Sequence, residues 1–259
     1  METFIREFFL LEGYQRPIEG YFSWQHLTFV SALMVLMVTA AIVLGRRNKN
    51  QPLGIQNRVL IWGALLIDSF ELFKIVIGCV QERNPMEWVY MLPLFLCSIQ
   101  LITIPLAAFS KGRIKAAALD FVCVFGLLGA VMGTYLAGNN YSAYPVLSFP
   151  NVVSGITHCI SGFCCLYIFL SGMASMEKRN APVVCGIMVG FAVAAYIANI
   201  FTDCNYMFLT RGDGTPYDIL HSLLGGNPVL YPLGVVGLFF LYIMAFYWVY
   251  GLVARKKKK

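Results

Sequence analysis

Cys97 and His158 are the two side chains of this sequence whose chemistry suits a nucleophile and its base. Cys97 lies in the segment LPLFLCSIQ, and His158 ends the segment NVVSGITH. A thiol becomes a nucleophile when a neighbouring base takes its proton, or when an imidazolium stabilises the thiolate. Contact between the two residues would therefore make them a candidate nucleophile and base.

The elements that must position this pair are membrane helices. The chain has 259 residues, of which 59% are hydrophobic and only 12% are charged, and its mean hydropathy is +0.70. Apolar runs of about 18 or more residues recur along the sequence, and runs of that length are typical of transmembrane helices. This composition excludes a soluble enzyme, a disordered protein and a nucleic-acid-binding module.

The predicted fold class is all-α, a polytopic bundle of seven transmembrane helices. Each apolar segment is long enough to cross about 30 Å of hydrocarbon. The expected spans are residues 26–45, 57–80, 92–109, 116–137, 154–173, 182–203 and 229–253. The resulting domains are an extracytoplasmic N-terminal segment (1–25), a single membrane domain (26–254) and a basic cytoplasmic tail (255–259).

Basic residues predict the orientation of these spans. Fourteen of the 19 Lys and Arg residues fall on one side, in the connections that follow the first, third and fifth spans and in the tail. Four fall on the other side, and Lys74 lies within the second span. The positive-inside rule then predicts an N-terminus outside and a C-terminus in the cytoplasm.

Polar residues within the spans gather in the outer half of the predicted bundle. Ionisable groups in membrane helices are costly and are functional candidates. Counted along their spans, Cys97 and His158 both lie roughly 6–8 Å below the outer interface. The other candidates at this level are His26, Asp68, Glu71, Lys74, Gln100, Asn199, Asp203, Asn205 and His221.

Side-chain types suggest roles within this cluster. A carboxylate would orient the histidine, as the third member of a catalytic triad does, and the candidates are Asp68, Glu71 and Asp203. Oxyanion donors would come from Asn199, from Asn205 or from backbone amides near Pro93. Asp120 is the exception, because it lies near the inner start of the fourth span, where we expect it to face headgroups beside Lys115.

Simpler explanations compete with chemistry at these positions. A histidine near a helix end often only bonds a neighbouring group, and Glu71 with Lys74 forms a plausible structural ion pair. The eight cysteines show no CxxC or zinc-type spacing, so neither a disulfide framework, a metal site nor a cofactor is expected. The same polar residues would also suit a transport pathway for a small solute or for protons.

Several segments resemble the YwaF-like family of integral membrane proteins. The matching segments are FSWQHL at the first span, LPLFLCS, NVVSGITH, ANIFTDCNYMFLT and GNPVLYP, which together reach from about residue 20 to about residue 250. That family is similar to eukaryotic membrane acyltransferases that act on ether phospholipids without coenzyme A. The resemblance implies that Cys97 carries the acyl group as a thioester and that His158 is the base. One departure is Phe95, where many relatives have a histidine.

The sequence thus predicts an acyltransferase or acyl hydrolase in the outer half of the membrane. Its expected partners are membrane lipids, with a phospholipid as acyl donor and a lysophospholipid as acceptor. The alternative is a transporter or binding protein that uses the same polar cluster. The terminal lysines are typical of an anchor at anionic headgroups, which favours a bacterial cytoplasmic membrane.

Overall fold

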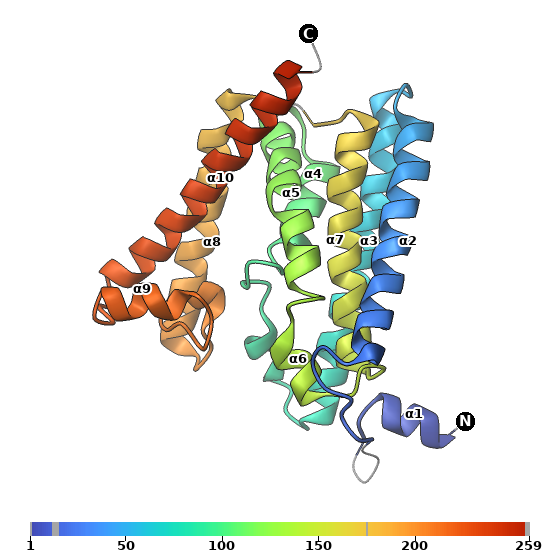
Figure 1. Cartoon of the computed structure of the whole chain (residues 1–259), viewed down its shortest axis with the longest axis vertical. Coiled ribbons are helices and arrows are strands. Elements are labelled where there is room, and N and C mark those ends of the chain that lie inside the picture. The colour runs from blue at the N-terminus through green and yellow to red at the C-terminus, as the bar shows by residue number, and fades with distance from the viewer. Residues whose placement is uncertain (1, 12–15, 175, 257–259) are drawn as a thin grey trace.

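The computed structural model describes residues 2–11, 16–174 and 176–256, and within them every regular element is helical (Figure 1). The last residues of the predicted basic tail, 257–259, lie outside the described residues. The long helices are α2 (Trp24–Asn48), α3 (Leu53–Gln81), α5 (Gly112–Met132), α7 (Phe149–Ser171), α8 (Ala181–Phe201) and α10 (Leu230–Lys256). The shorter ones are α1 (Glu2–Phe8), η1 (Glu87–Met91), α4 (Gln100–Phe109), α6 (Gly138–Ala143), η2 (Lys178–Asn180), η3 (Tyr206–Phe208) and α9 (Tyr217–Leu223).

Five helices of the described chain are long and apolar enough to cross a membrane, namely α2, α5, α7, α8 and α10. The all-helical class predicted from the sequence is confirmed. Helix α3 has 29 residues but is not among the five, and it carries Asp68, Glu71 and Lys74 within its length. Helix α4 is apolar but has only 10 residues.

The prediction of a continuous helix over residues 92–109 is wrong. Helix α4 begins only at Gln100, and the preceding residues form turns, with Ser98 N–H donating to the Phe95 carbonyl at 2.9 Å. Pro93 holds Leu92 before it in an extended conformation (ψ 147°), so no helix begins at residue 92. Cys97 therefore lies in a turn at the entrance of α4 rather than inside a helix.

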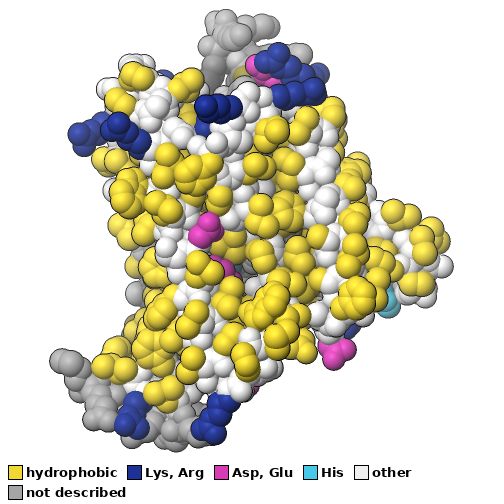
Figure 2. All heavy atoms as spheres, turned by 180° about the vertical axis from the view of Figure 1, so that it is seen from behind, with side chains coloured by type: hydrophobic (Ala, Val, Ile, Leu, Met, Phe, Trp, Pro, Cys, Tyr) yellow, Lys and Arg dark blue, Asp and Glu magenta, His cyan; other side chains and the backbone are white. Residues whose placement is uncertain are grey.

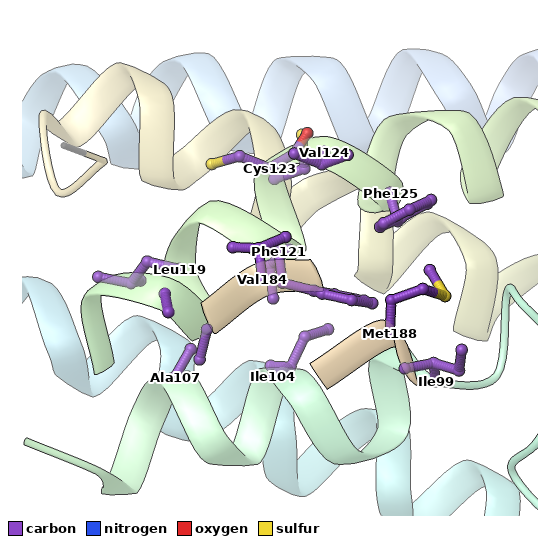
Figure 3. Close-up of a cluster of buried hydrophobic side chains, with 14 of the residues drawn as sticks. Ile99, Ile104, Ala107, Leu119, Phe121, Cys123, Val124, Phe125, Val184 and Met188 are labelled. Carbon is purple, nitrogen blue, oxygen red and sulfur yellow. The ribbon is translucent and has the colours of Figure 1, made fainter. Parts of the chain in front are cut away.

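Helix α7 is the centre of the bundle and packs against α2, α3 and α5, while α4 fills the space between α3 and α5. Helices α8 and α10 form a second group beside α5, with α9 across their ends at the N-terminal end of the molecule (Figure 1). Figure 3 shows the apolar core between the two groups, where Ile104 of α4, Phe121 of α5 and Met188 of α8 meet. Burial of such side chains stabilises each group against the other.

Asp120 of α5 does not face the headgroups, and that expectation is wrong. Its side chain is fully buried and accepts hydrogen bonds from Met176 N–H at 3.1 Å, Asn180 Nδ2 at 2.8 Å and Tyr247 Oη at 2.9 Å. Those donors satisfy the carboxylate in place of water. Asp120 thus ties α5 to the connection between α7 and α8, and to α10.

Candidate functional site

Cys97 occupies the turn that leads into α4. Its thiol is half-buried, and the Sγ atom lies 4.0 Å from the hydroxyl oxygen of Ser98. Among the described residues, no hydrogen-bond acceptor is found for the backbone N–H groups of Leu96 and Cys97. A thiol and two backbone donors without an acceptor among the described residues therefore lie together on one non-helical turn.

His158 belongs to α7, and its side chain lines the same cavity as Cys97. Its Nδ1 atom lies 2.7 Å from the carbonyl oxygen of Ser154, one turn earlier in α7. Because a carbonyl only accepts hydrogen bonds, Nδ1 carries the ring proton. The Nε2 atom is buried without a hydrogen-bond partner among the described residues, so its lone pair is available to Cys97.

A small cavity of about 40 Å³ joins these groups. That volume holds a few water molecules or a small functional group, but not a whole lipid. Its lining residues come from α3, from the turn and start of α4, and from α7: Ile67, Glu71, Lys74, Cys97, Ser98, Leu101, Ser154, Thr157 and His158. Of the predicted polar cluster, Cys97, His158, Glu71 and Lys74 thus lie at one cavity.

Glu71 and Lys74 form an ion pair at the wall of the cavity, with 2.5 Å between Oε1 and Nζ. Asp68 lies one turn before Glu71 on α3 and does not line the cavity. Neither carboxylate is hydrogen-bonded to His158 in the described structure, where the partner of Nδ1 is the Ser154 backbone. A backbone carbonyl thus orients the histidine, and the prediction that a carboxylate does so, as in a catalytic triad, is wrong.

The two predicted oxyanion donors from α8 and its following loop are also wrong. Asn199 pairs with the backbone of Tyr206 through both of its side-chain atoms, at 3.1 and 2.8 Å. Asn205 donates to the Arg211 carbonyl at 2.6 Å and to Asp213 at 2.7 Å. Both amides are therefore committed to holding their own loop.

The remaining predicted residues lie outside the cavity lining. His26 is fully buried, with Nε2 3.1 Å from the Thr134 carbonyl oxygen, and its ring packs on Tyr141. Gln100 is buried at the start of α4, where its Oε1 accepts a hydrogen bond from Thr103. Asp203 is exposed in the loop after α8, and His221 packs edge-on against Tyr231 beside α9. None of these four residues lines the cavity that Cys97 and His158 share.

Tyr206 is the residue that sequence reasoning missed. Its side chain is fully buried; the hydroxyl donates to the Val89 carbonyl at 2.9 Å and accepts from the Leu92 N–H at 3.2 Å. Its ring packs on Phe95 with centroids 4.9 Å apart. The loop after α8 thereby holds both ends of the segment that leads to Cys97, and no spacing in the sequence signals this contact.

We expect Tyr206→Phe to slow any reaction of Cys97 about 10- to 100-fold, because it frees the backbone of Leu92 while it keeps the ring against Phe95. Loss of two buried hydrogen bonds also lowers the free energy of unfolding by about 1–3 kcal/mol. The measurement is the rate at which a small thiol reagent and an acyl donor each modify Cys97. Tyr196→Phe is the matched control, since that hydroxyl donates to Pro228, away from the turn. Equal rates in both variants would contradict the positioning role.

Comparison with known proteins identifies the family. One family model matches residues 21–250, a range that includes every residue of the cavity. It is not a model of the YwaF-like family, so that resemblance is wrong, because short runs of aromatic, Gly, Pro and Asn residues are common at the ends of membrane helices. No curated protein and no solved structure matches the chain. With its several apolar helices, the chain is a multi-pass membrane protein that belongs to the TMEM164 family.

Proposed function

We propose that this protein is an integral membrane acyltransferase or acyl hydrolase that carries the acyl chain of a phospholipid as a thioester on Cys97. The observation that carries the proposal is a cavity lined by both the Cys97 thiol and a histidine whose Nδ1 is held by Ser154 and whose Nε2 has no partner among the described residues. A base oriented in this way is the arrangement that activates a nucleophile. The partners are a phospholipid donor and a lysophospholipid acceptor.

The first half-reaction transfers the acyl group to the enzyme. The Cys97 proton moves to Nε2 of His158, and Sγ attacks the ester carbonyl, whose electron pair moves to the oxygen. When the carbonyl re-forms, the ester C–O bond breaks and His158 returns its proton to the leaving alkoxide. A lysophospholipid leaves, and the acyl group remains on Cys97.

The second half-reaction regenerates the thiol. A lysophospholipid hydroxyl or a water molecule gives its proton to His158 and attacks the thioester, and the proton then returns to Sγ. In both halves the N–H groups of Leu96 and Cys97 are the donors available for the oxyanion, because they have no acceptor among the described residues. They are the backbone amides near Pro93 that the sequence predicts for this role.

Seven spans, with the N-terminus outside and the C-terminus in the cytoplasm, suit this reaction. Helix α3, with 29 residues, is about 44 Å long and can reach across the bilayer. The non-helical turn with α4 would complete another span, and such backbone is tolerated at membrane depth where it lines a cavity. Lys and Arg side chains gather at the end of the molecule that holds the C-terminus (Figure 2), which supports this orientation. The site then lies in the outer half of a membrane, and the bacterial cytoplasmic membrane stays our prediction.

The decisive experiment tests for the acyl-enzyme. Purified protein is incubated in liposomes with isotope-labelled phospholipid, and its intact mass is measured before and after treatment with hydroxylamine. We expect a labelled acyl adduct that hydroxylamine removes and that maps to the peptide containing Cys97. An unmodified protein with unchanged lysophospholipid would overturn the proposal.

A further inference from the structure

The cavity beside Cys97 is far smaller than the lipid it would serve, and this mismatch restricts how a donor can bind. A volume of about 40 Å³ accepts an ester group with a few neighbouring atoms. The glycerol, the headgroup and the acyl chains must then remain outside, against the surface of the bundle. Whatever recognises the headgroup must therefore lie at the rim of the cavity.

Lys74 is at that rim. Its side chain is 30% exposed, compared with 12% for Glu71, although both residues line the cavity. Figure 2 shows acidic side chains within an otherwise hydrophobic face of the molecule. Helix α3 carries two carboxylates, Asp68 and Glu71, within its length. The side chain of Lys74 thus lines the cavity and is also partly open to the surface of the bundle.

The ammonium group also has unused hydrogen-bonding capacity. It offers three donors, and the interaction that the described structure gives it is the ion pair with Glu71 Oε1. Among the described residues that line the cavity, Lys74 is the one Lys or Arg. Of the lining residues on α3, Lys74 is also the nearest to the outer end of that helix. A headgroup phosphate likewise lies nearer the outer surface of the membrane than its ester does.

We propose that Lys74 binds the phosphate of the donor lipid and so selects glycerophospholipids over neutral glycerides. This inference rests on the proposed function of the same site. In the resting state Glu71 holds the ammonium at the cavity wall, and the phosphodiester takes its place as counter-ion when the ester enters. Lys74 is the specificity-determining residue, and Glu71 competes with the ligand.

The test measures occupancy without requiring acyl transfer. A dialkyl ether analogue of phosphatidylcholine has no ester to cleave, and dialkylglycerol lacks the phosphate as well. The full-length protein in detergent micelles is alkylated with iodoacetamide, and the rate at Cys97 is followed by mass spectrometry of its peptide. We expect the ether phospholipid to slow alkylation of the wild type about tenfold, as a charge-assisted hydrogen bond to an anion would. Dialkylglycerol, with or without inorganic phosphate, is expected to leave the rate nearly unchanged.

Two substitutions that break the same ion pair are expected to have opposite effects. Lys74→Met should abolish the protection that depends on phosphate, and Lys74→Arg should restore most of it. Glu71→Gln should lower the concentration of ether phospholipid that gives half-maximal protection, because it removes the competing anion. Asp68→Asn, a neutralised carboxylate on the same helix outside the cavity, should behave as the wild type. Each rate is normalised to the same variant without lipid, so that effects on the thiol itself cancel.

Several results would overturn this assignment. Full protection in Lys74→Met would do so, as would equal protection of the wild type by dialkylglycerol or by inorganic phosphate alone. Glu71→Gln and Lys74→Met acting in the same direction would assign the pair a structural role. If Lys74→Met does not fold, Lys74→Arg and Glu71→Gln still decide the question. The two proposals can also fail separately. If no acyl-enzyme forms but the ether phospholipid still protects Cys97 through its phosphate, the proposed function is overturned and the phosphate-binding role of Lys74 stands.

Discussion

Replacement of Cys97 by alanine is expected to abolish acyl transfer, with a fall of at least about 10³-fold in the rate of lysophospholipid release. No other group in the cavity can form the thioester, since the remaining lining residues offer hydroxyls, an imidazole and the Glu71–Lys74 pair. The fold should survive, because the side chain lies half-buried in a turn and changes at such positions cost little stability. The measurement is release of lysophospholipid from labelled liposomes, together with circular dichroism.

Cys79→Ala is the matched control for this experiment. Cys79 is also a half-buried free cysteine, and its thiol lies near the Pro85 carbonyl instead of near a histidine. Turnover that persists in Cys97→Ala would refute the nucleophile assignment. The isosteric variant Cys97→Ser separates the two candidate functions, because a transport pathway lined by the same polar residues should tolerate it, whereas thioester chemistry should not.

The second large effect is expected from a single methyl group placed at Gly133. This residue ends α5 with φ −80° and ψ 0°, a conformation that alanine adopts without strain. A β-carbon there would overlap Cδ2 and Nε2 of His158, so the ring has to swing away from Cys97. We expect Gly133→Ala to lower acyl transfer about 100-fold, since displacement of a base by about 1 Å has effects of that size.

Gly129 provides the control one turn earlier in the same helix. A β-carbon at Gly129 would lie 3.8 and 3.9 Å from Cα and Cβ of Cys97, which is ordinary van der Waals contact. Gly129→Ala should therefore keep most of the activity, and both variants should retain the helical content of the wild type. A similar loss in the two variants would show that the close packing of α5, and not the position of His158, is responsible.

The helical class and most helix positions follow from the sequence because apolar periodicity and length report directly on membrane helices. Helices α2, α3, α5, α7, α8 and α10 each overlap a predicted span. The counted depth of Cys97 assumed a helix from residue 92, which the structure lacks, yet the structure places Cys97 and His158 at one cavity. What the counting cannot capture is the segment between Pro93 and Gln100, whose residues are mostly apolar but form turns instead of a helix.

The orienting contacts were not predictable because they join residues far apart in the chain or use the backbone. The base is oriented by the Ser154 carbonyl. Because every residue has a backbone carbonyl, no residue type in the sequence marks this contact. Asn199 and Asn205 looked like free amides from their types and depth, but each has local backbone partners. Tyr206 reaches a segment more than 100 residues earlier, and only the packing of α8 beside the bundle brings it there.

The late start of α4 also has an electrostatic consequence. The peptide dipoles of a helix add up to about half a positive charge at its N-terminus, and within the first turn that charge stabilises anions. Because α4 begins at Gln100, this end adjoins the turn that carries Cys97. The late start of the helix therefore places beside Cys97 a backbone field of the sign that a thiolate requires. Had the helix run on from residue 92, the sulfur would lie along its side, where the dipoles largely cancel.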